Sequence, residues 1–365
     1  MTGRADTCRA CGESGLVRVL DLGAVPAADH FPLLTEPVGA AECGHRLAMD
    51  LCPGCGLAQL AEDDTVTDEP RGVEPEALRE QAADAVRVVA AAGLLRGGTV
   101  REFGSPHGGT WVPLLTDVGY TEAATAPADI VLDCFGIMHE PDQRAAFRQR
   151  AQATAPDGVL LLQYHSIATI IAAGQWNALR HGHFAYYSLT TLVRQLAEVG
   201  MTVVAAWPFD LYGGTVLLAA VHAQNSAPEA SVGLLLAAED DLGITMPDAF
   251  RPLQAAADGD TGALRGWLQA EATGGRRVYA YAAASRAVAQ FARAGLDTTL
   301  IAGVADASDA KQGRRMPGTD IPIITPTELV AADPDLVLLT VPDLLDEVSR
   351  RHPALAGRLT TGGSL

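Results

Sequence analysis

The chain has 365 residues, which is enough for two or three domains with hydrophobic cores of their own. Its formal net charge of −18 argues against nucleic acid or an anionic membrane surface as a partner, although a local positive pocket could still bind a phosphorylated small molecule. No stretch approaches the ~20 apolar residues of a membrane span, and the N-terminus has no apolar signal segment. We therefore expect a globular, cytosolic protein that binds a small molecule and has no membrane partner, with its oligomeric state open.

Two cysteine pairs mark the N-terminal part of the chain. Cys8 and Cys11, and likewise Cys52 and Cys55, form two C-x-x-C-G motifs. Two thiolates at this spacing bind one side of a zinc ion, and a second pair completes a tetrahedron. The glycine after each pair allows the positive φ with which the turn wraps the metal. We favour a four-cysteine zinc site over a disulfide or a redox pair, because no βαβ pattern surrounds either motif.

Two further cysteines remain. Cys43, together with His45, is a less favoured substitute ligand, because the two pairs already supply four sulfurs. Cys134 follows an apolar run and is predicted to lie at the end of a buried strand. A site closed by four thiolates has no open coordination position, so the zinc would be structural and any chemistry must lie further along the chain.

The first half of the chain is predicted to be a zinc module followed by an α/β domain. Residues 1–60 form the module, with a strand at 16–20, and the acidic residues 61–75 form a linker or loop. A helix at 74–95 precedes a strand at 99–103 and a turn that contains Gly104, Gly108 and Gly109. This order is typical of nucleotide-binding loops, although alone it is a weak signal. The expected elements that follow are a strand at 129–135, a helix at 141–153, a strand at 158–164, a helix at 188–199 and strands at 201–207 and 214–222.

A mainly helical stretch at 225–273, with breaks near Pro247 and Pro252, leads into a second α/β unit. Its expected elements are a strand at 277–281, a helix at 285–294, strands at 299–302 and 321–324, a helix at 326–332, a strand at 335–340 and a helix at 343–350. The tail, 360–364, is predicted to be disordered. The fold class is therefore α/β in three parts: a zinc-binding module (1–60), a reduced Rossmann-like domain (75–225) and a C-terminal Rossmann-like domain (250–358).

This order of parts resembles one family, the bacterial sugar-nucleotide C-methyltransferases that branch TDP-keto-deoxysugars for antibiotics. Its members have a four-cysteine zinc module, a central S-adenosylmethionine domain and a C-terminal Rossmann-like domain. The resemblance covers nearly the whole chain. It rests on the cysteine pairs and on the segments GSPHG (104–108), HGHFAYYSL (181–189), YGGT (212–215) and KQGRRMPGTDIPI (311–323).

The resemblance places the catalytic segment around His183, which matches the family's general base for removing a proton beside a ketone. A histidine near neutral pKa suits that task. Arg180 stands where the family has tyrosine, and Gly182 stands where it has glutamate. We expect Arg180 to stabilise an enolate or carboxylate, Tyr186 to offer a phenol donor and His181 to be a further catalytic candidate. The alternative for each is ordinary packing or solvation.

The resemblance also implies S-adenosylmethionine, but the cofactor motifs depart from the family. Pro106 removes one backbone donor from the Gly-rich turn. Only residues 111–127 separate that turn from the next buried strand, and another strand, loop and helix would need roughly 30 residues more. We therefore expect cofactor binding at Gly104, Gly108 and Gly109 to be lost.

Candidate substrate contacts come from four further places. His165 follows a predicted strand at its carboxyl end, where α/β sites gather, and Tyr212 precedes two glycines. The first loop of the family's C-terminal domain resembles GYGAAAKG, and here residues 280–287 read AYAAASRA. Each alanine strains a position that needs φ > 0, whereas Arg286 keeps a cation suited to phosphate. Lys311 begins the long matching run and is the fourth candidate.

Three functions stay open from the sequence. The first is a diverged enzyme that no longer transfers methyl and uses His183 as acid and base on an enolisable keto compound, such as a TDP-keto-sugar or a polyketide-type intermediate. Isomerisation, elimination and cyclisation are all compatible with it. The second is a methyltransferase that still uses S-adenosylmethionine, and the third is a non-catalytic helper of another biosynthetic enzyme.

Overall fold

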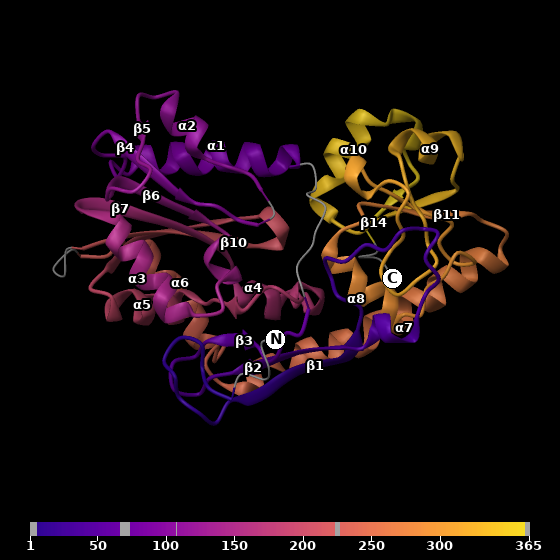
Figure 1. The fold of residues 1–365 in the computed structure, drawn as a ribbon, viewed down its shortest axis with the longest axis horizontal. Helices are drawn as coiled ribbons and strands as arrows, with labels where there is room; N and C mark the ends of the chain where they lie inside the picture. The colour runs from indigo at the N-terminus through magenta and orange to yellow at the C-terminus, as the bar shows by residue number, and fades with distance from the viewer. Residues whose placement is uncertain (1–5, 66–73, 107, 223–226, 362–365) are drawn as a thin grey trace.

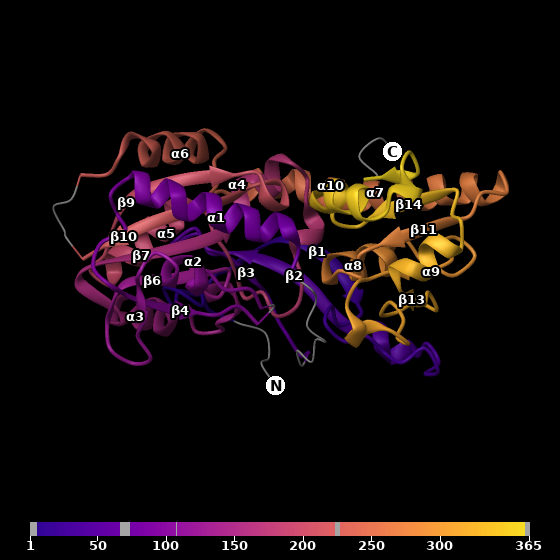
Figure 2. The ribbon, with the colours of Figure 1, turned by 90° about the horizontal axis from the view of Figure 1, so that it is seen from above.

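A computed structural model describes residues 6–65, 74–106, 108–222 and 227–361. It contains three sheets, one for each predicted part of the chain (Figures 1 and 2). The prediction of an α/β fold with a zinc module and two Rossmann-like units is confirmed. Most of the predicted acidic linker at 61–75 and of the tail at 360–364 lies outside the described residues. Among those that are described, no helix combines the length and apolarity needed to cross a membrane.

The N-terminal sheet is antiparallel and is not confined to the N-terminal module. Its strands lie in the order β1-β2-β3-β8, and the last of them comes from the middle of the chain. Ala58 pairs with Tyr186 and Gln59 with Ala185, so the module's third strand lies beside the residues that follow His183. The strands are β1 (Val17–Val25), β2 (His45–Leu51), β3 (Ala58–Leu60) and β8 (Ala185–Tyr186).

The central sheet has six strands in the order β5-β4-β6-β7-β10-β9. The first four are parallel, and β10 runs antiparallel to both of its neighbours, as predicted for the end of this domain. The strands are β4 (Thr99–Phe103), β5 (Thr121–Glu122), β6 (Ala128–Cys134), β7 (Thr154–His165), β9 (Thr202–Phe209) and β10 (Thr215–Val221).

Helices cover both faces of the central sheet (Figure 1). Because side chains alternate along a strand, Ile130 and Leu132 of β6 pack beneath α1 and α2, whereas Val131 packs toward α3 and α5. Side chains cap two of these helices: Asp142 accepts from the Ala145 amide, and Ser188 accepts from that of Thr191. The helices are α1 (Glu76–Ala91), α2 (Val112–Thr116), α3 (Gln143–Ala153), α4 (Ile167–Ala172), α5 (Leu189–Glu198) and α6 (Ala230–Asp241).

The C-terminal sheet is wholly parallel, in the order β13-β12-β11-β14-β15. Its strands are β11 (Val278–Tyr281), β12 (Val304–Ala305), β13 (Ile323–Ile324), β14 (Leu336–Leu339) and β15 (Leu359–Thr360). The long helix α7 (Arg251–Thr273) runs into this domain, which also contains α8 (Ser285–Arg293), α9 (Pro326–Ala331) and α10 (Leu345–Arg351).

Three predictions about these elements were wrong. The strand expected at 299–302 lies at 304–305, because the Asp297 carboxylate and carbonyl accept from the amides of residues 299–301 and form a turn. Between the Gly-rich turn and β6 there is a second strand, β5, since α2 spans only five residues and leaves room for it. Thr360, placed in the disordered tail, ends β15.

The loop between the two cysteine pairs ties the N-terminal module to the C-terminal domain. Figure 1 shows this part of the chain running from beneath the central domain to the C-terminal one. The buried Arg315 guanidinium binds the Glu42 carboxylate at 2.7 and 2.9 Å, and the Gly318 amide donates to the same carboxylate. This contact joins the N-terminal module to the C-terminal domain. The pocket described next lies between the C-terminal and central domains.

Candidate functional site

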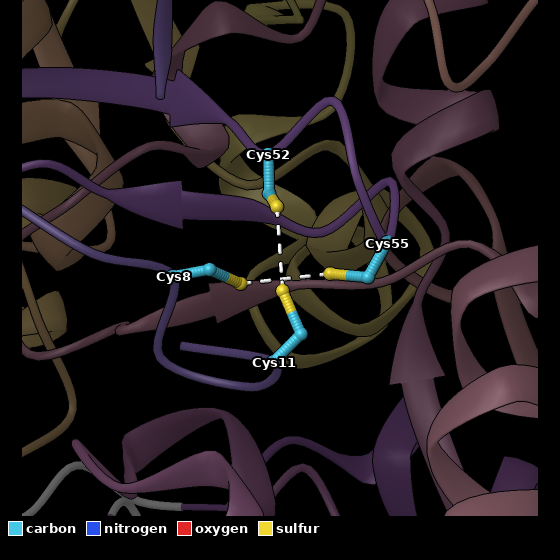
Figure 3. Close-up of side chains that lie close together, drawn as sticks. All are labelled: Cys8, Cys11, Cys52 and Cys55. Atoms are coloured by element: carbon cyan, nitrogen blue, oxygen red, sulfur yellow. Dashed lines mark hydrogen bonds between the residues drawn. The ribbon is translucent and has the colours of Figure 1, made fainter. Parts of the chain in front are cut away.

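The four paired cysteines come together in one cluster, with their side chains pointing at one another from two loops (Figure 3). All four sulfurs lie within 4.8 Å of one another, with Cys8 and Cys55 at 3.5 Å and Cys11 and Cys52 at 3.6 Å. Zinc–sulfur bonds of about 2.3 Å in a tetrahedron put the sulfurs about 3.8 Å apart. The cluster therefore fits one zinc ion with no open position, which is a structural site.

The turns around the cluster follow the predicted geometry. Gly12 and Gly56 have φ of 80° and 81°, and their amides donate back to the carbonyls of Cys8 and Cys52. The substitute ligands considered from the sequence lie elsewhere. His45 pairs with Asp64 through Nδ1 at 2.8 Å, and the Cys43 sulfur lies against Gly318 of the C-terminal domain.

A pocket of about 290 Å³ lies between the central and C-terminal domains. Its wall contains residues from both domains and from the connection at Glu74. Its volume is near the lower end of the range for small-molecule sites, ~300–1,000 Å³. Seven of the residues predicted to be catalytic or substrate-binding line it: His165, Arg180, His183, Tyr186, Tyr212, Arg286 and Lys311.

His183 is the centre of one side of this pocket. The Nε of Arg180 donates to Nε2 of His183 at 2.8 Å, and the rings of His139 and His183 meet edge to face at 4.5 Å between centroids. An imidazole nitrogen that accepts a hydrogen bond carries no proton, so the Arg180 contact holds a neutral His183. The Tyr186 hydroxyl accepts from the Arg180 amide at 3.0 Å, and burial raises the pKa of this phenol.

The turn before His183 is held from two directions. The Gly182 amide donates to the Asp63 carboxylate at 2.8 Å, and His139 Nδ1 donates to the Gly182 carbonyl at 3.0 Å. Gly182 has φ of 78°, which glycine adopts without strain. Because Asp63 follows β3 of the N-terminal sheet, the zinc module takes part directly in positioning His183.

The opposite side of the pocket carries His165, Tyr212 and Arg286. The Nε2 atom of His165 is buried and has no hydrogen-bond partner among the described residues. Burial lowers the pKa of His165 to about 3, and the positive charge of Arg286 acts in the same direction. The Arg286 guanidinium lies over the Tyr212 ring, 5.4 Å from its centroid. This side therefore presents a neutral imidazole beside a cation.

Lys311 lines the pocket but is already engaged. Its ammonium group donates to the Ala283 carbonyl at 2.9 Å and lies 3.7 Å from the Asp306 carboxylate. It also lies over the Phe31 ring, at 4.9 Å from the centroid. Its predicted substrate contact would require one of these interactions to be exchanged.

Backbone strain gathers around this pocket. Four non-glycine residues in the described part of the chain have positive φ, and three of them line the pocket: Phe135, Tyr212 and Ala282, with φ of 62°, 56° and 75°. Each such conformation costs roughly 1–2 kcal/mol. Strain of this kind persists where surrounding structure enforces it and clusters at functional sites. Ala282 bears out the strain expected where the related loop has glycine.

His181 does not reach the pocket, which does not fit the catalytic role predicted for it. Its Nε2 forms a hydrogen bond with the Arg46 carbonyl at 3.1 Å, and its ring packs edge-on against His45. The tight turn at residues 181–182 directs His181 and His183 in different directions, since only an extended backbone would put them on one face.

The Gly-rich turn borders the large pocket at Ser105 and Gly108, and it also borders an adjoining, much smaller cavity of about 30 Å³ lined by Gly104, Gly108 and Gly109. The Glu102 carboxylate accepts from the Trp111 amide and the Thr110 hydroxyl, so it occupies donors at the start of α2. A water molecule needs roughly 10–15 Å³, so this cavity has space for a water or two. As described, it does not fit S-adenosylmethionine.

Three residues that position or line the site were not predicted to do so. His139 and Phe135 follow β6 at its carboxyl end, and the strand-end rule used for His165 applies to them equally. Asp63 had no such signal, because its role depends on β3 lying beside β8. A ligand-sized cavity beside His183 also argues against a purely non-catalytic helper.

Comparison with known proteins places these features in a family context. Family models match in three segments: a zinc binding domain at residues 8–67, a methyltransferase domain at 126–206 and a C-methyltransferase C-terminal domain at 210–363. The C-methyltransferase NovU of Streptomyces niveus is 25% identical over 397 aligned residues, covering 93% of this chain and 91% of that protein.

Solved structures give weaker likenesses. A toxoflavin-pathway N1-methyltransferase of Burkholderia thailandensis is 13% identical, with a TM-score of 0.32 over 45% of this chain and 94% of that one. Magnesium protoporphyrin IX methyltransferase of Synechocystis is 11% identical, with a TM-score of 0.30 over 40% of this chain and 84% of that one. These scores are too low to add to the assignment.

Proposed function

From the premise that the chain resembles C-methyltransferases over almost its whole length, we propose that it is a diverged enzyme of this kind that transfers protons, not methyl groups. The substrate is an enolisable keto compound, such as a TDP-keto-sugar or a polyketide-type intermediate. His183 acts as the general base and acid, and the net reaction is an isomerisation, elimination or cyclisation. One observation carries this proposal: the ligand-sized cavity brings His183, Arg180 and Arg286 together, whereas the cavity beside Gly104 and Gly109 measures only about 30 Å³.

The cofactor side of the molecule supports the loss of methyl transfer. S-Adenosylmethionine would supply the methyl group where it binds, but a cavity of about 30 Å³ has no space for it. The methyltransferase family model matches only from residue 126, beyond the Gly-rich turn. Glu102 and Glu74 also face this turn, and their carboxylates would oppose the carboxylate of the cofactor.

The residues of the larger pocket suit proton transfer beside a ketone. Neutral His183 removes the proton through Nε2 once the substrate takes the place of Arg180 on that nitrogen. The displaced guanidinium then faces the developing enolate oxygen, whose negative charge a cation held in place stabilises. His183 afterwards returns the proton to another carbon or to a leaving group, so no oxidant or metal is consumed.

Solvent exchange tests this assignment without knowledge of the product. The purified protein is mixed in D₂O with TDP-4-keto-6-deoxyglucose or with 3-oxohexanoate, and loss of the α-proton signal is followed by NMR. We expect catalysed exchange with at least one probe and a decrease of about 10²–10⁴-fold in His183→Gln. His30→Gln, which changes an exposed histidine outside the pocket, is the matched control. Equal exchange in wild type and His183→Gln would exclude His183 as the base.

One observation favours the alternative of a methyltransferase that still binds S-adenosylmethionine. Strand β5 ends at the exposed Glu122, and an acidic residue at the end of the second strand is the usual partner of ribose hydroxyls in such folds. Calorimetry with S-adenosylmethionine separates the two functions. We expect no heat of binding at concentrations where methyltransferases saturate, and tight binding would favour the alternative.

A further inference from the structure

Two arginines from different domains line the same pocket. Arg180 belongs to the turn before His183, and Arg286 belongs to the first turn of α8 in the C-terminal domain. Burying a cation is costly unless an anion pairs with it. Two partly buried cations therefore line one cavity in a protein of net charge −18, and this arrangement favours an anionic ligand.

Arg286 provides the clearest evidence for that ligand. It makes no hydrogen bond or ion pair with any residue in the described part of the chain, and its guanidinium lies over the Tyr212 ring at 5.4 Å. Burial and the positive charge of Arg180 both lower the pKa of Arg286. The guanidinium thus lies within the field of a second guanidinium, and although Asp343 acts on it electrostatically, no carboxylate of the described residues pairs with it directly.

The neighbouring loop is not arranged to receive a diphosphate. The Ala283 amide, which such a group would bind at the start of α8, already donates to the Asp306 carboxylate at 2.8 Å. Lys311 is engaged by the same carboxylate and by the Ala283 carbonyl. Ala282, with φ of 75°, adds a Cβ where a glycine would let a phosphate approach the backbone. The Asp306 carboxylate therefore occupies the amide that a diphosphate would bind, and its negative charge would repel the diphosphate.

The remaining polar groups match a smaller anion. A guanidinium binds a carboxylate through two parallel hydrogen bonds, and a second one can hold the outer lone pairs. The buried Nε2 of His165, which has no partner, adds an uncharged hydrogen bond on the same side. A cavity of about 290 Å³ accommodates a short chain but is small for a nucleotide joined to a sugar.

We propose that the substrate is a small keto acid whose carboxylate is held by Arg286 and Arg180 and whose enolisable carbon lies beside His183. This inference rests on the proposed proton-transfer function, and it selects a keto acid over a sugar nucleotide. Arg286 anchors the ligand and Arg180 links the carboxylate side to the base. The wall at Tyr212 and Phe135 supplies the apolar surface for the carbon chain.

Calorimetry with matched probes tests the carboxylate. The titrants are 3-oxohexanoate, its methyl ester, inorganic pyrophosphate and TDP, each added to the full-length wild-type protein. We expect 3-oxohexanoate to bind about 10–100-fold more tightly than the ester, because the ester cannot form the charged hydrogen bonds. Neither pyrophosphate nor TDP should displace it. Equal binding of acid and ester, or displacement by TDP, would overturn the keto-acid assignment.

Substitutions at Arg286 identify the anchor. We expect Arg286→Leu to weaken 3-oxohexanoate binding about 10–100-fold and Arg286→Lys to weaken it less, since lysine keeps the charge but loses the two-pronged geometry. Arg194→Leu, which changes an exposed arginine of α5, should bind like wild type. Without ligand, Arg286→Leu should raise Tm, because it removes a partly buried charge that pairs with no carboxylate of the described residues. Unchanged affinity in Arg286→Leu, or a lowered Tm in the unliganded variant, would contradict the proposal.

Binding and exchange together separate the two proposals. If His183→Gln binds 3-oxohexanoate like wild type but no longer exchanges its α-proton, both stand. If wild type binds the keto acid and does not exchange it, the anion site stands and the assigned chemistry fails. If exchange occurs only with TDP-4-keto-6-deoxyglucose, the chemistry stands and the keto-acid assignment fails.

Discussion

The four-cysteine cluster and the interdomain pocket are built in different ways. Each half of the cluster is complete within four residues, and the metal itself dictates the spacing and the glycine that follows. The pocket collects side chains from the central domain, the C-terminal domain and the connection between them. A metal site of this kind can therefore be predicted from short sequence motifs, whereas a pocket between domains depends on how whole domains pack.

The two regions are nevertheless joined. Cys55 lies three residues before β3. Strand β3 pairs with β8, which begins two residues after His183. The Leu60 amide donates to the Phe184 carbonyl at 3.2 Å, and Asp63 holds Gly182. From the sequence we expected a structural zinc, with any chemistry further along the chain. The structure instead places the zinc module in direct contact with the turn that carries His183.

Disrupting the zinc site is the strongest way to test that connection. We expect Cys55→Ser to lose zinc, because a structural four-thiolate site contributes up to ~10–16 kcal/mol to folding of its module. Amides of β3 and β8 should both lose hydrogen-exchange protection, and proton exchange on the keto probe should fall with them. Cys43→Ser, outside the cluster, should keep one zinc per chain. Full protection of β8 in a zinc-free protein would show that the two regions are independent.

A smaller effect is expected from pH at the pocket. Because the pKa of His165 is about 3 in the folded protein and about 6.5 in an unfolded chain, acid protonates the unfolded state first. Stability is thus present above pH 6.5 and is lost as pH falls toward 3, by about 2 kcal/mol between pH 7 and pH 5. Urea unfolding at both pH values measures this loss.

The variant His165→Gln should show a weaker pH dependence than wild type over the same interval, because glutamine does not titrate. His352→Gln is a useful comparison, since His352 is only partly buried and lies outside the pocket, although burial also lowers the pKa of its imidazole. An unchanged pH dependence in His165→Gln would mean that this imidazole is not held neutral in the pocket.

The smallest expected effect concerns strain. Ala282→Gly relieves a positive φ that costs alanine roughly 1–2 kcal/mol, offset by about 0.5–1 kcal/mol of extra chain entropy. We expect a net stabilisation of about 0.5–1 kcal/mol in urea unfolding. Ala283→Gly, at the next residue, has no strain to relieve and should destabilise by about 1 kcal/mol. Destabilisation by both would show that the Ala282 backbone is not strained.

Much of the candidate site was recognisable in the sequence because it lies in short segments. His183, Arg180 and Tyr186 stand in one run that resembles the catalytic segment of a known family, and they meet at the pocket. His181 stands in the same run but turns away to Arg46, since residue type says nothing about the direction of a side chain in a turn. Asp63 and His139 were missed as positioning residues because neither lies near Gly182 in the sequence.

Taken alone, the sequence determined most of the elements and the zinc ligands, since apolar periodicity and metal spacing act over a few residues. Pro106 also led to the prediction that cofactor binding is lost, which calorimetry with S-adenosylmethionine tests. Only the tertiary structure decided which histidines share a cavity and where the zinc module contacts the turn that carries His183. Only it brought Arg180 beside Arg286. These outcomes depend on the packing of domains whose contacting residues are separated by about a hundred positions or more, as Asp63 and Gly182 are.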